Sequence, residues 1–277
     1  MTSSDHNEIF LLEKDTLPLD DYISNTLVQM QVHPNTNNTP VNVPQKSINL
    51  IPAITFGTHN INGFCNDTTK LKQCMIFCNE LNIDIVVITE TNTSTRNGKF
   101  IDTKTYGYSS FWTGDNVKIK GSGIAILIAD HLQRFISKVH TAISNYVLHI
   151  TFLFRGCNLH VIGLYYPSND INVQQQIHHY IKHTIHNFKQ DVLNRVVILG
   201  DFNSITNRFL DRTGSSRFYK KPSQLLDTLQ QYLYIDTFRF MHPNEKQFTW
   251  NSSQSCIPTP ISSRIDQIWV SLIGLQI

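Results

Sequence analysis

Carboxylate and amide side chains stand directly after stretches that the sequence predicts to be buried strands. Glu90 follows the run 83–89 (IDIVVIT), whose β-branched residues are typical of a strand buried on both faces. Asp201 and Asn203 follow the run 195–199 (RVVIL) in the same way. Polar groups at the ends of buried strands are costly unless they are paired or bound to a cation, so these positions are candidates for chemistry.

The same pattern recurs at two further predicted strands. Asn60 and Asn62 follow the segment 53–58, and Asp266 lies within the last strand, in SRIDQIW. If these strand ends converge at one rim, they form an oxygen-rich pocket of the kind that Mg²⁺ prefers. Taken singly, each residue is as well explained as part of a turn or as a solvated side chain. The hypothesis of a metal site therefore depends on their convergence.

The elements that must position these side chains follow from hydrophobic periodicity. Three segments are predicted to be helices: 68–79, 171–193 and 223–232. The predicted strands are 53–60, 83–89, 106–112, 123–129, 146–154, 159–165, 195–199, 248–250 and 263–271. Many strands with only three helices favour an α/β (α+β) sandwich, in which sheets pack together and helices lie outside.

Length and composition exclude several classes of protein. The chain has 277 residues with 12 Gly and 10 Pro, which excludes collagen-like and low-complexity sequences. Its longest apolar runs, such as 123–129 (GIAILIA), are far shorter than the ~18 residues of a membrane span, and the acidic N-terminus is unlike a signal peptide. We therefore expect an intracellular protein without a membrane partner. The five cysteines are expected to be reduced core thiols, with a metal-binding pair at Cys74 and Cys78 as the alternative.

Charge divides the chain into two parts. Residues 1–50 hold six acids and two bases, a net charge of −4, and include the Asn/Thr/Pro-rich stretch 34–44. We expect this part to be a disordered acidic tail, with a short helix near 19–32 as the exception. Residues 51–277 hold 21 bases and 15 acids, a net charge of +6, and form the predicted domain. A basic domain is consistent with a polyanionic ligand such as nucleic acid.

Five motifs in order give the domain a family resemblance. It resembles the endonuclease/exonuclease/phosphatase superfamily over roughly residues 50–277. The motifs are THNING (58–63), ITET (88–91), LYYPSN (164–169), ILGDFN (198–203) and SRIDQIW (263–269). Within that superfamily it is most similar to the endonuclease domains of LINE-type retrotransposons, through LDRTG (210–214) and YIDTFRFMHPNEKQFTW (234–250). The resemblance implies a four-layer sandwich of two mixed β-sheets flanked by helices.

The resemblance also implies roles for the residues that bind the metal and activate water. Glu90 would be the main Mg²⁺ ligand, and Asn62 would lie in the metal's shell, where many members have an Asp. Asp201 would orient or deprotonate the attacking water, and Asn60 would hydrogen-bond Asp201.

The remaining implied roles concern the phosphate. Asn203 would contact the scissile phosphate, Tyr165 would donate its phenol to a phosphate oxygen, and Asp266 would orient a catalytic His. The implied reaction is phosphodiester hydrolysis dependent on Mg²⁺, or on Mn²⁺ in its place. The implied partner is nucleic acid, DNA in a retroelement-type endonuclease, cut by a monomer in the nucleus.

The final motif of the family, Ser-Asp-His, has no counterpart in this sequence. The last histidine is His242, and the eleven residues after Asp266 contain neither His nor Asp. This predicts a domain cut before its last catalytic element, with its closing strand or strands missing and a sheet edge left unpaired. Because a lost catalytic partner costs orders of magnitude in rate, the sequence puts activity in question.

Two alternatives to an active endonuclease follow. The first is a degenerate, non-catalytic retroelement remnant or nucleic-acid-binding domain, and the second is a phosphoesterase acting on phosphoinositides or other phosphate esters. None of the other histidines is expected to replace the missing one. His178, His179, His183 and His186 are predicted to form a polar helix face rather than a metal site, His59 to lie in the core and His242 in a turn.

Overall fold

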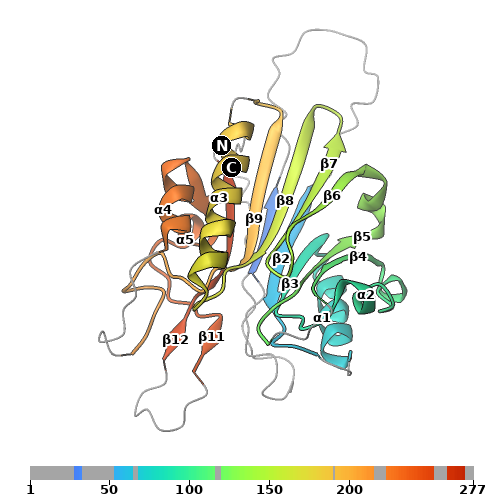
Figure 1. The fold of residues 1–277 in the computed structure, drawn as a ribbon, viewed down its shortest axis with the longest axis horizontal. Helices are drawn as coiled ribbons and strands as arrows, with labels where there is room; N and C mark the ends of the chain where they lie inside the picture. Colours follow the sequence, from blue (N-terminus) through green and yellow to red (C-terminus); the bar gives the residue numbers. More distant parts are fainter. Residues whose placement is uncertain are drawn as a thin grey trace, which may run out of the picture.

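Two β-sheets packed face to face form the centre of the protein in a computed structural model (Figure 1). The structure describes residues 28–32, 53–64, 68–115, 120–189, 191–214, 223–252 and 261–271. The first sheet has the strand order β1-β2-β3-β5-β4. Its strands are β1 (Val28–Val32), β2 (Ile54–Asn60), β3 (Ile85–Thr89), β5 (Ile124–Ala129) and β4 (Tyr108–Thr113).

The second sheet has six strands, and a two-stranded ribbon accompanies it. The six-stranded order is β10-β13-β9-β8-β7-β6. Its strands are β10 (Tyr234–Asp236), β13 (Asp266–Ser271), β9 (Asn194–Asp201), β8 (Cys157–Tyr165), β7 (Val147–Phe154) and β6 (Ile136–Ile143). The ribbon pairs β11 (Trp250–Asn251) with β12 (Ser262–Ser263).

Helices cover the outer faces of both sheets, so the predicted four-layer α/β sandwich is confirmed (Figure 1). On the five-stranded sheet lie α1 (Thr69–Glu80), α2 (Thr95–Gly98) and the 3-10 turn η1 (Lys104–Tyr106). A second 3-10 turn, η2 (Asp130–Phe135), follows β5 and contributes Leu132 to the core between the sheets. On the six-stranded sheet lie α3 (Ile171–Phe188), α4 (Gln224–Gln231) and α5 (Thr237–Met241). No helix in the described ranges is long and apolar enough to cross a lipid bilayer.

Three apolar clusters hold the layers together. The largest lies between the sheets, with Phe56 of β2 and Phe152 of β7 among its members. A second packs the Ile177/Ile181/Ile185 stripe of α3 against the outer face of the six-stranded sheet, as the periodicity predicts. The third packs α1 against the five-stranded sheet and contains the thiols of Cys74 and Cys78, which are buried and unlinked, 4.0 Å apart.

Three strands differ from the predictions, the shortest being β10, which was not predicted. Residues 28–32 form β1, antiparallel to β2, and not the helix or disordered tail expected there; the rest of the tail lies outside the described residues. Strand β1 forms one edge of the five-stranded sheet, beside β2. Strand β6 was not predicted at all, because its side chains are mostly exposed and give no apolar alternation.

Two segments end or begin elsewhere than predicted. The helix predicted to reach residue 193 ends at Phe188, before a turn that leads into β9. The strand predicted from residue 106 begins at Tyr108, after η1 and the left-handed Gly107 (φ 75°).

Histidines His149 and His160 are buried together beneath α3. Nε2 of His149 lies 3.1 Å from Nδ1 of His160, and its Nδ1 lies 2.8 Å from the hydroxyl of Tyr180. Burial, with the nearby charge of His160, lowers the pKa of His149 to about 3. His149 is therefore neutral in the folded protein and protonates more readily in the unfolded chain.

This pair predicts sensitivity to mild acid. The contribution of His149 to stability is complete above the unfolded pKa of 6.5 and is lost as the pH falls toward the folded pKa. We expect a loss of about 2 kcal/mol in the free energy of unfolding between pH 7.5 and pH 5. His149→Gln should reduce that loss, as measured by urea unfolding at both pH values. An unchanged loss in the variant would show that His149 is not its source.

Candidate active site

Strand register brings the predicted residues into two rows. In the six-stranded sheet, Tyr165 of β8 is paired with Asp201 of β9, which is paired in turn with Asp266 of β13. Residues directly opposite each other in a sheet point to the same face, so these three side chains share one face. In the five-stranded sheet, Asn60 is paired with Thr89, the residue before Glu90. The sequence prediction that these strand ends converge is confirmed.

The amide of Asn60 joins the two sheets at this point. Its Nδ2 donates to Oδ2 of Asp201 at 2.8 Å and to Oε1 of Glu90 at 2.9 Å. Its Oδ1 accepts the backbone N–H of Asn62 at 2.9 Å. The bond to Asp201 was predicted, whereas the bond to Glu90 was not. One amide therefore fixes the distance between the two carboxylates.

Asp201 is a buried carboxylate held on both oxygens. Its side chain is 1% exposed, and Oδ1 accepts the backbone N–H of Asn203 at 2.8 Å. Burial, followed by the negative charges of Asp266 and Glu90, raises the pKa of Asp201 well above its usual value. A carboxylate with a raised pKa is suited to take a proton from water near neutral pH.

Asp266 is also buried, but its carboxylate makes no hydrogen bond to the described residues. The neighbouring hydroxyl of Thr249 accepts the backbone N–H groups of Ile265 and Asp266, each at 3.1 Å. Burial and the charge of Glu90 raise the pKa of Asp266 to about 7. A buried carboxylate without a hydrogen-bond partner would stabilise a cation or a proton donor bound next to it.

Tyr165 and Asn203 complete the polar cluster. Tyr165 is 8% exposed, and burial, together with the charges of Glu90 and Asp201, raises its pKa above the usual value. Its hydroxyl therefore stays protonated and interacts with both Glu90 and Asn203. The Asn203 Nδ2 donates to the carbonyl of Tyr166 at 3.0 Å, which fixes the direction of that amide.

Three residues of the site have left-handed backbones that only glycine adopts without cost. The φ angles are 49° at Asn62, 53° at Glu90 and 45° at Asn203. Such conformations cost of order 1 kcal/mol each and persist where surrounding contacts determine them. Here they occur just after strands β2, β3 and β9, whose ends meet at the site.

The donor set fits a hard divalent cation. It consists of the Glu90 carboxylate and the Asn62 amide oxygen, with the carboxylates of Asp201 and Asp266 nearby. Burial, followed by the charges of neighbouring carboxylates, raises the pKa of both aspartates. In the described part of the chain, no three acidic, His or Cys side chains are assembled as a ready metal cage. Mg²⁺ needs none, because it keeps several waters and binds through one or two carboxylates. Glu90 is the half-buried carboxylate at the site, and Asn62 is exposed beside it.

A groove with a volume of about 720 Å³ adjoins Asn203. Its lining includes Tyr166 just after β8, Gln175 of α3, Arg212 of the segment after β9, and Trp250 of the β11–β12 ribbon. Sequence reasoning assigned no role to Arg212 or Trp250, although both lie in the quoted motifs LDRTG and FTW. A mixed aromatic, amide and basic lining suits a nucleotide-sized ligand.

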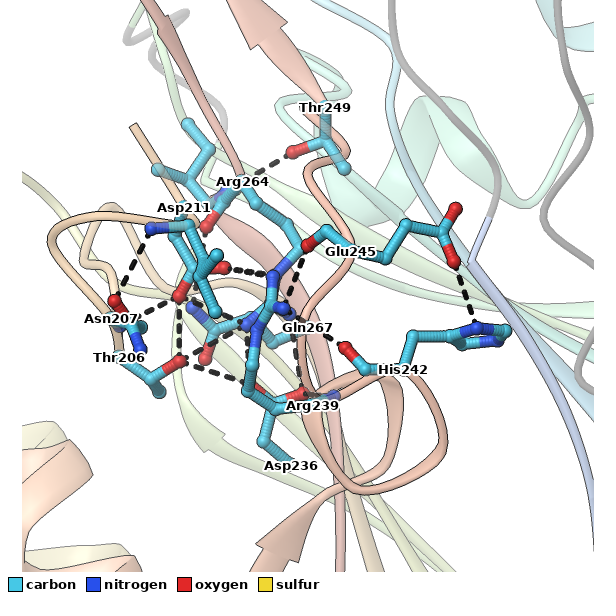
Figure 2. A network of polar contacts seen from close by, with 12 residues as sticks. Thr206, Asn207, Asp211, Asp236, Arg239, His242, Glu245, Thr249, Arg264 and Gln267 are labelled. Carbon is cyan, nitrogen blue, oxygen red and sulfur yellow. Dashed lines mark hydrogen bonds and ion pairs between the residues drawn. The ribbon is translucent and has the colours of Figure 1, made fainter. Parts of the chain in front are cut away.

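A buried ion network holds the segments around this groove (Figure 2). Arg264 is 1% exposed, its Nε donates to Oδ1 of Asp211 at 2.8 Å, and its guanidinium also pairs with Asp236. Arg239 donates to the same Asp211 oxygen at 2.6 Å. Sequence reasoning missed this network, although each of its charges lies in a motif that carries the resemblance.

The histidines have the roles that the sequence predicts for them. His59 is buried, and its pKa is lowered to about 4 by burial and by Lys70. On α3, His179 and His183 are exposed, while His178 bonds to Thr228. His242 ends α5 and pairs with Glu245 at 2.9 Å.

Solved structures share this fold. The 3′ phosphatase NExo from Neisseria, bound to a product DNA hairpin, matches with a TM-score of 0.61 and 21% identity, over 78% of this chain and 86% of that one. An AP endonuclease from Archaeoglobus fulgidus matches with a TM-score of 0.59 and 16% identity, over 78% and 86% of the two chains. D. rerio TDP2 with a single-strand DNA product matches with a TM-score of 0.54 and 13% identity, over 78% and 82%.

Comparison of the sequence with protein-family models agrees with the similarity of fold. Residues 57–276, which include every residue of the site just described, match the model of the endonuclease/exonuclease/phosphatase family. This chain belongs to the endonuclease/exonuclease/phosphatase family.

Proposed function

We propose that this protein hydrolyses phosphodiester bonds of DNA with Mg²⁺ or Mn²⁺, as an endonuclease of retroelement type. The observation that supports this most is the single amide of Asn60, which holds Glu90 and Asp201 together at the convergence of both sheets. The fold neighbours include DNA-bound enzymes, and the domain carries a net positive charge. The motifs LDRTG, YIDTF and RID, which resemble retroelement endonucleases, supply the charges of one buried network.

In this proposal the chain's own residues divide the work of hydrolysis. Asp201 takes the proton from the attacking water, with Asn60 and the Asn203 backbone holding its two oxygens in place. The protonated hydroxyl of Tyr165 and the amide of Asn203 donate to phosphate oxygens. Glu90 and Asn62 would hold the divalent cation, which supplies positive charge for the phosphate and the leaving oxygen.

Asp266 has a different part in the proposal. Its carboxylate has no hydrogen-bond partner among the described residues and faces the same side of the sheet as Asp201. We assign it the task of stabilising a proton donor near the phosphate. No histidine occurs between His242 and Ile277 to take that place, so we expect slow turnover from these 277 residues.

Glu90→Gln tests the metal site by two independent measurements. With Mg²⁺ at ten times its dissociation constant, the wild-type protein should gain about 1.4 kcal/mol in the free energy of unfolding, and the variant should gain much less. Nicking of supercoiled plasmid should fall by at least about 100-fold, because the amide removes the charge that binds the cation. Glu80→Gln, at the exposed end of α1, is the matched control.

The same assays separate the alternatives. Stabilisation by Mg²⁺ and DNA binding without any nicking would indicate a non-catalytic nucleic-acid-binding domain. Phosphate release from small phosphomonoesters without nicking would indicate a phosphoesterase instead. Equal stabilisation of wild type and Glu90→Gln by Mg²⁺ would contradict the proposed metal ligand.

A further inference from the structure

Phe209 is an aromatic side chain presented to solvent in the segment that follows Asn203. Its side chain is 76% exposed, and it lies six residues after Asn203. The following residue, Leu210, is half-buried, and Ile205 at the start of the same segment is buried. The segment therefore has apolar residues that face the protein and one large apolar residue that faces away.

The turn that carries Phe209 is fixed by hydrogen bonds on both sides. The Oδ1 of Asn207 accepts the backbone N–H of Phe209 at 2.9 Å and that of Leu210 at 3.2 Å. The Oδ2 of Asp211 accepts the N–H of Asn207 at 2.7 Å and the hydroxyl of Thr206 at 2.8 Å. Because the backbone is already ordered, a ligand that contacts Phe209 does not have to order the turn.

The turn is also anchored to the strand that carries Asp266. Asp211 is fully buried and lies at the centre of the network in Figure 2, where it pairs with Arg264 and Arg239. Arg264 precedes Asp266 by two residues. The position of the Phe209 turn relative to the candidate active site is therefore set by buried ion pairs.

The groove beside Asn203 borders this segment. Arg212 lines the groove and is bridged to Ser263 of β12, another lining residue. Arg208 precedes Phe209, and its guanidinium lies 5.7 Å from the Phe209 ring centre. The segment that carries the exposed ring thus contributes two basic residues, Arg208 against the ring and Arg212 in the groove.

From these contacts we propose that Phe209 stacks on bases of the bound DNA beside the cleavage site, with Arg208 contacting a flanking phosphate. Aromatic rings bind bases through their π-faces, and apolar side chains inserted at a base step partly unstack it. A rigid, exposed ring beside a nucleotide-sized groove has the position and chemistry for this role. This inference rests on the proposed function, since it names how that site engages its DNA.

Binding of a short duplex containing 2-aminopurine tests the proposal, in the Asp201→Asn background so that the DNA stays uncut. Phe209→Ala should weaken binding about tenfold and abolish the rise in 2-aminopurine fluorescence that accompanies unstacking. Phe209→Trp, which keeps an aromatic ring, should retain both the affinity and the rise in 2-aminopurine fluorescence. Arg208→Gln should lower the slope of log K against log salt concentration by the equivalent of about one phosphate contact. Phe209→Ala should leave that slope unchanged.

The control is Phe100→Ala, because Phe100 is 83% exposed but follows α2 on the other sheet. Each substitution is also made alone in the wild-type protein, and hydrolysis of bis(p-nitrophenyl) phosphate by these variants is measured. This small ester reports the chemistry separately from DNA binding. Equal affinity and fluorescence for Phe209→Ala and the Asp201→Asn parent would overturn the inference, as would a protein that hydrolyses the ester but binds no duplex. Weakened binding by Phe209→Ala in a chain that hydrolyses nothing would support the inference and reject the hydrolytic function.

Discussion

Asp201→Asn is expected to lower the rate of DNA nicking by at least about 1,000-fold. The substitution keeps the size of the side chain but removes the carboxylate that the proposal assigns to accept a proton from water. Asp201 is held by Asn60 at 2.8 Å and by the Asn203 backbone at 2.8 Å, so its direction is fixed before substrate arrives. The measurement is the initial rate of conversion of supercoiled plasmid to open circles with Mg²⁺ present.

The fold should survive this substitution, which makes the rate interpretable. Burial and the charges of Asp266 and Glu90 disfavour the Asp201 carboxylate, so a neutral amide relieves repulsion while it disturbs the bond to Asn60. These effects oppose each other, and the melting temperature should change by only a few degrees. Asp191→Asn, at an exposed carboxylate before β9, is the control. Nicking by Asp201→Asn at the wild-type rate would exclude Asp201 as the base.

The site could be predicted from the sequence because its residues follow buried strands. Parallel pairing of β2 with β3 and of β8 with β9 places Asn60 beside Glu90 and Tyr165 beside Asp201. An apolar run that ends in a carboxylate can be recognised from the sequence alone, and the convergence of several such strand ends follows from sheet geometry. The four-layer fold follows for the same reason, since buried β-branched runs and an amphipathic α3 determine which faces meet.

Elements held by long-range polar contacts could not be predicted. Strand β1 pairs with β2 through its backbone, and its five residues (VQMQV) stand next to the Asn/Thr/Pro-rich stretch 34–44, so their short alternation is easily passed over. The bond from Asn60 to Glu90 depends on how two strands approach, which spacing does not reveal. The ion pair of Arg264 with Asp211 joins residues 53 positions apart, and each charge of the network looks like a surface residue when its segment is considered alone.

That network leads to the second large effect, a loss of about 3–5 kcal/mol in the free energy of unfolding for Arg264→Met. The variant leaves the carboxylates of Asp211 and Asp236 buried after their shared guanidinium is removed. Although burial opposes ionisation of Asp211, Arg264 holds the pKa of that carboxyl below its usual value. Urea unfolding at pH 7 measures the loss.

Arg239→Met is the comparison variant. It tests whether the loss of stability depends on how deeply the ion pair is buried or only on the number of ion pairs removed. Its partner Asp211 keeps Arg264, and the Arg239 side chain is 13% exposed, so we expect a smaller loss of about 1–2 kcal/mol. Equal losses in the two variants would contradict the central position of Arg264. Since Arg264 joins the Phe209 turn to the strand of Asp266, its loss should impair DNA binding and nicking together at temperatures where the variant is still folded, whereas Asp201→Asn should impair nicking alone.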